Sequence, residues 1–174
     1  MKSKTAYSLW LTPTGEASLT LTNLISDLSG RYSSPSFAPH VTLLGELTDS
    51  YEAIESRASK LSMNFRPQQI KLTKVEYLDE YFRCLFIRVE ETAEIIEANL
   101  RAREIFDRQN DLRYMPHLSI LYGNFPQATK DEIIRRIGRQ FTLSFEVTRL
   151  CLIDTSSRPE DWLMRRDFPF GSTT

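Results

Sequence analysis

The chain contains only two histidines, and both stand in the same surroundings. Each follows a proline and precedes a hydroxyl residue by two positions, in the pairs His40–Thr42 and His117–Ser119. Because a β-strand points residues i and i+2 to the same face, each imidazole would share a face with a hydroxyl group. Two such pairs facing one another would place one imidazole on each side of a bound anion. In-line displacement at phosphorus needs that arrangement, with a base on the attacking oxygen and an acid on the leaving oxygen.

The repetition of the pattern distinguishes these two histidines from ordinary structural residues. A single histidine in a strand is most often a packing residue whose ring is satisfied by its neighbours. A matched pair in a chain without any other histidine favours a shared chemical role. A zinc site fits poorly, because a histidine and a hydroxyl residue two positions apart are no ligand set, and no cluster of Cys or His supplies the rest. We therefore expect proton transfer without a metal or other cofactor.

Apolar residues follow each histidine and predict the strands that would carry it. Alternate positions of these strands are expected to face the core: Val41, Leu43, Leu118 and Ile120. The preceding proline suits the first residue of a strand, because no N–H partner is needed there. Gly45 and Gly123 are expected to end the two strands.

The segments around these strands show helical and strand periodicity in a repeated order. Helices are predicted from Leu21 to an end marked by Gly30, from about Asp49, from about Thr92 to Asp107, and from a capping box at 129–132. Strands are predicted at 6–12, 69–78, 82–89, 141–147, 149–154 and 162–166, with a bend between Leu72 and Val75. The order helix, histidine strand, helix, strand, strand occurs twice, with the histidines 77 residues apart (117 − 40). This repeat predicts a single α+β domain, residues 1–174, made of two similar lobes.

Composition limits the class of substrate. Lys and Arg number 22 against 23 Asp and Glu, so the chain lacks the broad basic field of a protein that grips long nucleic acid. No apolar run approaches the roughly 18 residues of a membrane span, and the polar start at 1–5 leads into a strand rather than a signal-peptide core. Cys84 and Cys151 lie in strand-like runs and are expected to be buried thiols of a reducing cytoplasm. We expect a cytoplasmic monomer that binds a small molecule and no membrane.

The histidine motifs resemble those of the two-histidine (2H) phosphoesterase superfamily, above all its plant and yeast cyclic phosphodiesterase branch. The likeness runs through five segments: Tyr7-Ser8-Leu9-Trp10, Phe37-Ala38-Pro39-His40, Phe82-Arg83-Cys84, Tyr114-Met115-Pro116-His117 and the closing Trp162. It spans nearly the whole chain, and the histidine motifs are its most specific part. The resemblance implies two lobes of antiparallel sheet with outer helices around a central cleft, and a chain that crosses between the lobes.

The resemblance also implies roles for individual residues. The implied set comprises the catalytic pair His40 and His117, the phosphate-binding residues Thr42, Ser119 and Tyr122, and the substrate-binding aromatics Trp10 and Phe82. In the cyclic phosphodiesterase branch the second histidine activates water and the first protonates the leaving oxygen, which makes His117 the base and His40 the acid. The residues alone leave Trp10 and Tyr122 open to a packing role. They also leave Phe82 open to a role in an ordinary hydrophobic turn.

The predicted function is metal-independent hydrolysis of cyclic phosphates. The expected reactions convert ADP-ribose 1″,2″-cyclic phosphate to ADP-ribose 1″-phosphate, and nucleoside 2′,3′-cyclic phosphates to 2′-phosphates. One alternative is the RNA 2′,3′-cyclic phosphodiesterase/ligase of the bacterial branch, which would act on RNA ends and weaken steeply with salt. Another is a non-catalytic nucleotide-binding module, against which the intact imidazoles and hydroxyls argue.

Overall fold

The computed structural model describes residues 5–171, which form eight strands and four α-helices. The strands are β1 (Tyr7–Leu11), β2 (Val41–Leu47), β3 (Gln68–Glu76), β4 (Leu85–Val89), β5 (His117–Leu121), β6 (Gln140–Val147), β7 (Arg149–Asp154) and β8 (Leu163–Pro169). The helices are α1 (Gly15–Tyr32), α2 (Tyr51–Ser62), α3 (Ala93–Ile105) and α4 (Gln127–Ile137), and a short 3-10 helix, η1 (Pro159–Asp161), precedes β8. Within the described residues, no helix is both long enough and apolar enough to cross a membrane.

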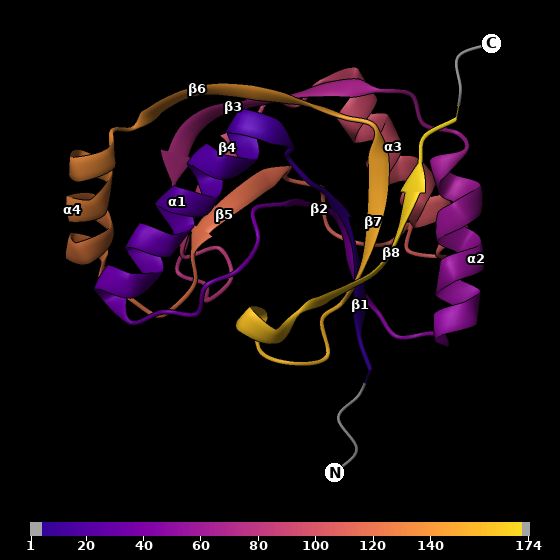
Figure 1. Ribbon diagram of the computed structural model, residues 1–174, viewed down its shortest axis with the longest axis horizontal. Helices are drawn as coiled ribbons and strands as arrows, with labels where there is room; N and C mark the ends of the chain where they lie inside the picture. Colours follow the sequence, from indigo (N-terminus) through magenta and orange to yellow (C-terminus); the bar gives the residue numbers. More distant parts are fainter. Residues whose placement is uncertain (1–4, 172–174) are drawn as a thin grey trace.

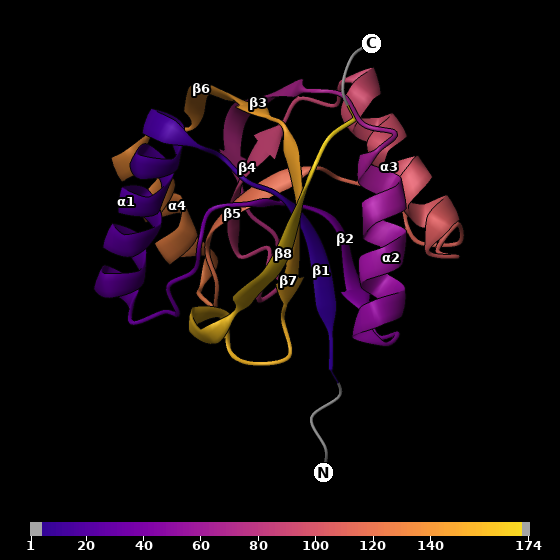
Figure 2. The same ribbon diagram turned by 45° about the vertical axis from the view of Figure 1, so that its right-hand side comes forward.

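All eight strands belong to one antiparallel sheet in the order β6-β3-β4-β5-β2-β1-β7-β8, with the histidine strands β2 and β5 at its centre (Figure 1). The half β2-β1-β7-β8 takes its strands from both ends of the chain, and the half β6-β3-β4-β5 takes them from the middle. Helices α1 and α4 flank one side, and α2 and α3 flank the other (Figure 2). Helix α1 packs on β5 and α3 packs on β2, so the chain crosses between the halves before each histidine strand. The predicted α+β architecture is confirmed, whereas the division of one domain into two lobes stays a prediction.

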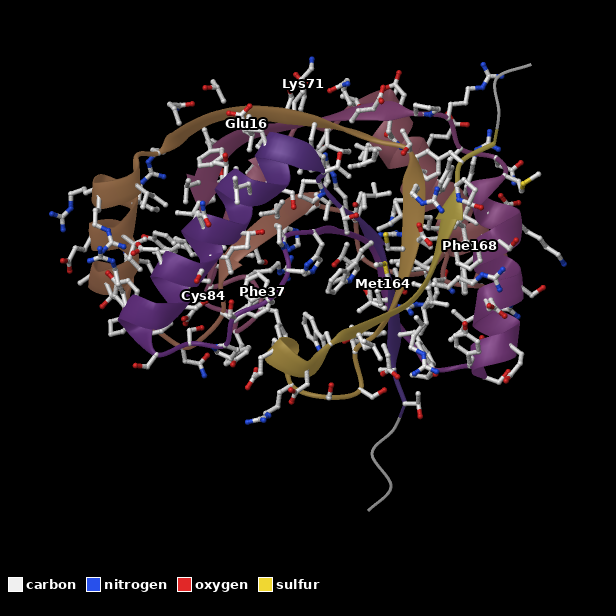
Figure 3. The ribbon with its side chains drawn as sticks, in the orientation of Figure 1. Glu16, Phe37, Lys71, Cys84, Met164 and Phe168 are labelled. Carbon is white, nitrogen blue, oxygen red and sulfur yellow. The ribbon has the colours of Figure 1, made fainter. Side chains whose placement is uncertain are left out.

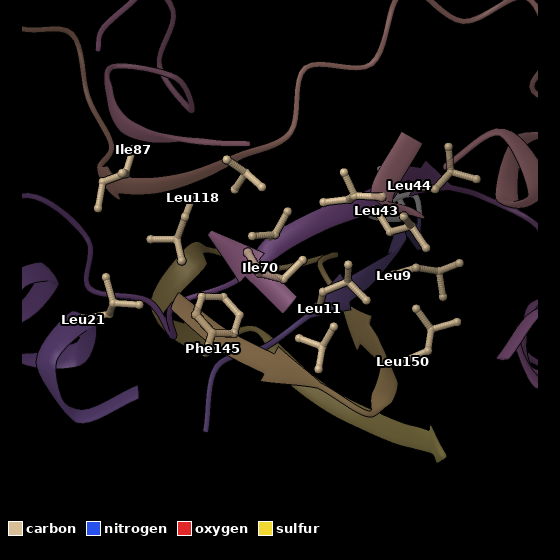
Figure 4. Packing of buried hydrophobic residues seen from close by; sticks show 14 of the residues in the cluster. Leu9, Leu11, Leu21, Leu43, Leu44, Ile70, Ile87, Leu118, Phe145 and Leu150 are labelled. Atoms are coloured by element: carbon tan, nitrogen blue, oxygen red, sulfur yellow. The ribbon is translucent and has the colours of Figure 1, made fainter. Parts of the chain in front are cut away.

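The face of β2 and β5 that was predicted to enter the core does so. Val41 and Leu118 form a cross-strand pair between the two strands, and both are fully buried. Leu43 and Ile120, two residues further along each strand, are also buried in the main hydrophobic cluster, of which Figure 4 labels Leu43 and Leu118. Burying a side chain of this size stabilises the fold by about 1.5–3 kcal/mol. The core therefore fixes which face of each histidine strand remains available for chemistry.

Two predicted ends of elements are wrong. Helix α1 continues past Gly30 and ends where Ser33 adopts a left-handed φ of 51°. A glycine costs a helix interior about 1 kcal/mol relative to alanine but keeps its N–H and C=O, so it does not stop the helix. Strand β2 likewise continues through Gly45, because Leu47 pairs with Tyr7 of β1 beyond an irregularity in the register.

Helix α4 begins at Gln127, two residues before the predicted capping box, so that prediction is also wrong. Pro126 stands at the N-cap with a φ of −57°, and its carbonyl oxygen accepts the N–H groups of Thr129 and Lys130. Thr129 therefore lies inside the first turn. The fixed φ of proline starts the helix where the sequence pattern alone indicated a hydroxyl cap.

Strand β3 has the predicted irregularity, whereas strand β4 begins later than predicted. Their pairing register shifts between Leu72 and Val75, which confirms the predicted bend. Strand β4 begins at Leu85 instead of residue 82, because residues 77–84 form the loop that joins it to β3. This loop carries Phe82 outside the sheet.

Candidate active site

The register of the two central strands places the predicted site residues opposite one another. Val41 and Leu118, which directly follow the two histidines, form the buried pair between β2 and β5. Continued by one residue toward the start of β2, the antiparallel register sets His40 opposite Ser119. Continued the other way, it sets Thr42 opposite His117. His40 and His117 are then diagonal neighbours, whose Cα atoms lie roughly 7–8 Å apart in an antiparallel pair.

One cavity of about 350 Å³ brings the predicted residues together. All seven line it: Trp10, His40, Thr42, Phe82, His117, Ser119 and Tyr122. Six further residues complete the lining: Ala6, Ser8, Gly45, Glu46, Thr155 and Trp162. Among these, Ser8 and Trp162 lie in segments of the family likeness. Thr155 gave no signal, because it follows β7 and reaches the cavity only through the folded sheet.

Both histidines are held by the same backbone contact. His40 Nδ1 lies 2.7 Å from the carbonyl oxygen of Ala38, and His117 Nδ1 lies 2.8 Å from that of Met115. A carbonyl oxygen only accepts hydrogen bonds, so Nδ1 carries the proton in each ring. The fixed φ of the intervening proline limits the freedom of this short turn. Nε2 is therefore the nitrogen of each imidazole that remains for proton transfer.

His40 lies against the indole of Trp10 in a parallel stack. The ring centroids are 3.4 Å apart and the planes differ by 4°. Trp10 is held in turn, because its Nε1 donates to Ser8 Oγ at 2.8 Å and Trp162 packs edge-on at 5.6 Å. Burial is the main reason that the pKa of His40 falls to about 4; a backbone carbonyl opposes the fall, and the charge of His117 adds to it.

His117 is less enclosed, and its ring packs edge-on against Phe86 at 5.2 Å. Burial lowers the pKa of His117, the Met115 carbonyl opposes this, and the positive charges of Arg83 and Arg88 lower the pKa further. Both imidazoles are therefore neutral at pH 7 unless an anion lies between them. A phosphate there would raise the pKa of each ring, because an opposite charge favours the protonated form.

Two side chains from the middle of the chain hold the backbone of β2 in place. The Tyr114 hydroxyl donates to the carbonyl oxygen of Thr42 at 2.8 Å. Asn99 of α3 donates through Nδ2 to the carbonyl oxygen of Leu43, also at 2.8 Å. Strand β2 pairs with β5 only through Val41 and Leu118. The two hydrogen bonds therefore help to hold the Thr42 hydroxyl in position relative to the histidines.

The loop at 77–84 is fastened from both sides. Ser119 Oγ donates to the carbonyl oxygen of Phe82 at 2.8 Å, and the buried Lys130 of α4 donates through Nζ to that of Leu78 at 2.9 Å. The Phe82 ring is 52% exposed at the cavity and is free to stack on a flat base. A hydroxyl donates a single proton, so Ser119 must leave the Phe82 carbonyl before it can bond a phosphate oxygen.

Tyr122 both packs against aromatic rings and lines the cavity. Phe37, which is labelled in Figure 3, stacks on the Tyr122 ring; their centroids are 3.8 Å apart and the planes differ by 16°. Phe82 and Trp162 approach its ring edge-on at 5.1 and 6.0 Å. Burial raises the pKa of the Tyr122 hydroxyl far above its usual range, so the group stays protonated and remains a donor.

The other titratable groups of the described residues offer no metal site. No three His, Cys, Asp or Glu side chains within 5–171 gather so that they could hold a metal ion. Cys84 and Cys151 are free and buried, which confirms the prediction of buried thiols. Burial raises the pKa of both thiols, so they are protonated at neutral pH. The titratable side chains that line the cavity are those of His40, His117, Glu46 and Tyr122.

An antiparallel sheet with a histidine–hydroxyl pair on each of its two central strands defines a two-histidine phosphoesterase. The family described as cyclic phosphodiesterase-like protein matches residues 5–162, and the chain belongs to it. A cyclic phosphodiesterase of Arabidopsis thaliana is 26% identical over 161 residues, which cover 88% of this chain and 87% of that protein. The protein is therefore an enzyme with cyclic phosphodiesterase activity, and the alternative of a non-catalytic binding module is set aside.

Solved structures share the fold. E. coli LigT complexed with NADP⁺ matches with a TM-score of 0.69 at 14% identity, over 97% of this chain and 99% of that one. The protein TT0787 of Thermus thermophilus matches with a TM-score of 0.70, also at 14% identity, over 97% of this chain and all of the other. At such low identity the likeness shows the fold alone. LigT has also been solved with 3′-AMP and with ATP.

Proposed function

We propose that this cyclic phosphodiesterase hydrolyses ribose cyclic phosphates without a metal, by proton transfer between water, the phosphate ester and its two histidines. The observation that carries the proposal is the register of β2 and β5. It sets each imidazole beside the hydroxyl of the opposite strand, and one cavity contains all four groups.

In the proposed reaction His117 is the base and His40 the acid. Nε2 of His117 takes a proton from water while the water oxygen attacks phosphorus. The bond from phosphorus to the ribose oxygen breaks on the opposite side, and that oxygen takes a proton from Nε2 of His40. The hydroxyls of Thr42 and Ser119 donate to the non-bridging oxygens, on which negative charge builds as phosphorus becomes five-coordinate. Tyr122 borders the same phosphate.

The acid role requires a protonated His40, although burial lowers its pKa to about 4. The anionic substrate raises the pKa of both rings, and the face of the stacked Trp10 stabilises an imidazolium. Substrate binding should therefore be accompanied by proton uptake. The acid and the base start in opposite protonation states, so turnover should follow a bell-shaped pH profile.

The proposed substrates are ADP-ribose 1″,2″-cyclic phosphate and nucleoside 2′,3′-cyclic phosphates. The exposed ring of Phe82 offers a face on which a base can stack, whereas Trp10 borders the cavity but is itself buried against His40 and Trp162. The solved complexes of LigT with NADP⁺, 3′-AMP and ATP support the choice, because a protein of the same fold takes nucleotides. In the substrate orientation that the family resemblance implies, the 3′ oxygen of a nucleoside substrate faces His40.

Phosphorus NMR of the reaction products tests the proposal directly. Nucleoside 2′,3′-cyclic phosphates should give the 2′-phosphate, and ADP-ribose 1″,2″-cyclic phosphate should give the 1″-phosphate. A predominant 3′-phosphate would reverse the acid and base roles. Failure to open any cyclic phosphate of this panel would refute the assignment of substrates.

The second candidate function is that of an RNA 2′,3′-cyclic phosphodiesterase/ligase. The shared fold with LigT is the observation that favours it. The formal net charge of −1 speaks against a long nucleic acid as the substrate. Measuring the rate between 50 and 200 mM salt separates the two functions, because contacts to many phosphates weaken steeply with salt.

We also propose that the enzyme is a cytoplasmic monomer whose two lobes act as one catalytic domain. The continuous sheet across β2 and β5 supports the single domain, because the site is made by both of its halves. A mass measurement by light scattering in solution should give 20.2 kDa, the mass of one chain.

A further inference from the structure

A second cavity adjoins the candidate active site. It has a volume of about 520 Å³, and Thr42, Gly45, Glu46 and His117 line both cavities. A ligand whose cyclic phosphate lies between the histidines can therefore extend into this neighbouring groove past His117. The groove is otherwise bounded by the end of α3 and the segment at 107–115.

Arginines are concentrated along this groove. Four of them line it: Arg83, Arg103, Arg108 and Arg113. The acidic residues of the lining are Glu46 and Asp111, and Glu80 and Glu91 outside the lining bind Arg83 and Arg113. Guanidinium groups are the chemistry that recognises phosphate oxygens.

Two of the arginines build the wall of the groove. Arg103 is buried and donates to the carbonyl oxygens of Asp111 and Leu112 at 3.0 and 2.5 Å, while its Nε has no partner among the described residues. Arg108 binds the Asp111 carboxylate at 2.8 Å and the carbonyl oxygen of Gly45 at 3.2 Å. Arg108 and Asp111 therefore neutralise each other within the wall, whereas Arg103 makes no ion pair among the described residues and keeps an uncompensated positive charge.

The other two arginines stand at the mouth in exposed ion pairs. Arg83 follows Phe82, and its Nε and Nη2 bind Glu80 at 2.7 and 2.8 Å. Its charge lies close enough to lower the pKa of His117. Arg113 binds Glu91 at 2.8 Å and is 85% exposed. Exposed ion pairs contribute little stability, so either guanidinium can turn to a phosphate at low cost.

We propose that this arginine groove is a subsite for a second phosphate of the substrate, so that the enzyme prefers cyclic nucleotides that carry a further phosphate or pyrophosphate group. The inference rests on the proposed function, because it assigns the cyclic phosphate to the adjoining cavity. The occupant is a small nucleotide rather than an RNA strand, because the chain as a whole is not basic and carries a formal net charge of −1.

Kinetics on two matched substrates test the subsite. Adenosine 2′,3′-cyclic phosphate and the same compound with a 5′-phosphate differ only in the second phosphate. The wild-type enzyme should show a KM at least about tenfold lower for the phosphorylated compound, the size of effect expected from charge-assisted hydrogen bonds. In the double variant Arg83→Gln, Arg113→Gln, the ratio of the two KM values should approach one. The control Arg101→Gln, which removes an exposed ion pair of α3 outside the groove, should keep the wild-type ratio.

Calorimetry provides a readout that does not depend on turnover. Adenosine 2′,5′-bisphosphate should bind about tenfold more tightly than adenosine 2′-phosphate, and the double variant should lose this difference. Equal affinity of the wild-type enzyme for the two ligands would overturn the subsite, whatever the activity on cyclic substrates. Loss of activity toward both cyclic compounds, with the affinity difference intact, would instead overturn the proposed function alone. A clear preference for an oligonucleotide with a 2′,3′-cyclic end, with a steep salt dependence, would contradict the small-molecule occupant.

Discussion

The burial of His40 predicts that the protein loses stability on acidification in a way that one substitution removes. The pKa of His40 is about 4 in the folded protein, against about 6.5 for an exposed histidine. The unfolded chain therefore binds a proton between these pH values that the folded protein does not. Above pH 6.5 His40 is mostly neutral in both the folded and the unfolded protein, and the fold has its full stability. The free energy of unfolding then falls as the pH decreases toward 4. At about 1.36 kcal/mol per pH unit, the loss from pH 7.5 to 4.5 is about 2–3 kcal/mol.

Urea unfolding at pH 7.5, 6.5, 5.5 and 4.5 measures this loss in the wild-type protein and in His40→Asn. The asparagine amide keeps a donor near the position of Nδ1 for the Ala38 carbonyl but does not titrate. Carboxylates also titrate in this range and affect both proteins, so the difference between the two curves isolates His40. The wild-type protein should lose about 2–3 kcal/mol more than the variant. The parallel variant His117→Asn should show a difference in the same direction, because burial lowers that pKa as well.

An equal loss of stability in the wild-type protein and in His40→Asn would refute the reasoning. It would mean that His40 is protonated in the folded protein at acidic pH without cost. The stack on Trp10 would then leave the imidazole accessible to water or would fully stabilise its positive charge. Burial would not lower the pKa of His40 in that case.

Three further predictions concern catalysis. Replacing His40 or His117 with Ala should each reduce kcat by roughly 10²–10⁴, and the double variant should lose far less than the product, because the two act as a unit; a single variant that keeps a third of the wild-type rate would contradict the assignment. Thr42→Val keeps the strand-forming shape and should slow turnover by about 10²-fold if its bond strengthens in the transition state; a change in thermal stability alone would make the hydroxyl structural. Activity should survive dialysis against EDTA, and loss with recovery on added zinc or magnesium would overturn the metal-free mechanism.

The candidate site was accessible to sequence reasoning because its key residues lie in local patterns. The i, i+2 spacing of His40 with Thr42, and of His117 with Ser119, needs nothing beyond strand geometry to share a face. The apolar residues between them then assign the opposite face to the core, as the buried pair of β2 and β5 shows. Element ends were less predictable. Gly30 and Gly45 do not end their elements, because the helix hydrogen bonds and the ladder to β1 continue past them.

What the sequence determined was the set of groups: two imidazoles, two hydroxyls and the strands that carry them. Only the tertiary structure decided that His40 stands opposite Ser119, because the register of β2 on β5 depends on contacts between distant parts of the chain. The low pKa of His40 and the bond from Ser119 to the Phe82 carbonyl also depend on contacts between distant parts of the chain. The fold likewise brings four arginines from separate segments to the groove that His117 borders. Strand periodicity acts over a few residues, whereas burial, register and charge clustering are set by which segments the fold brings together.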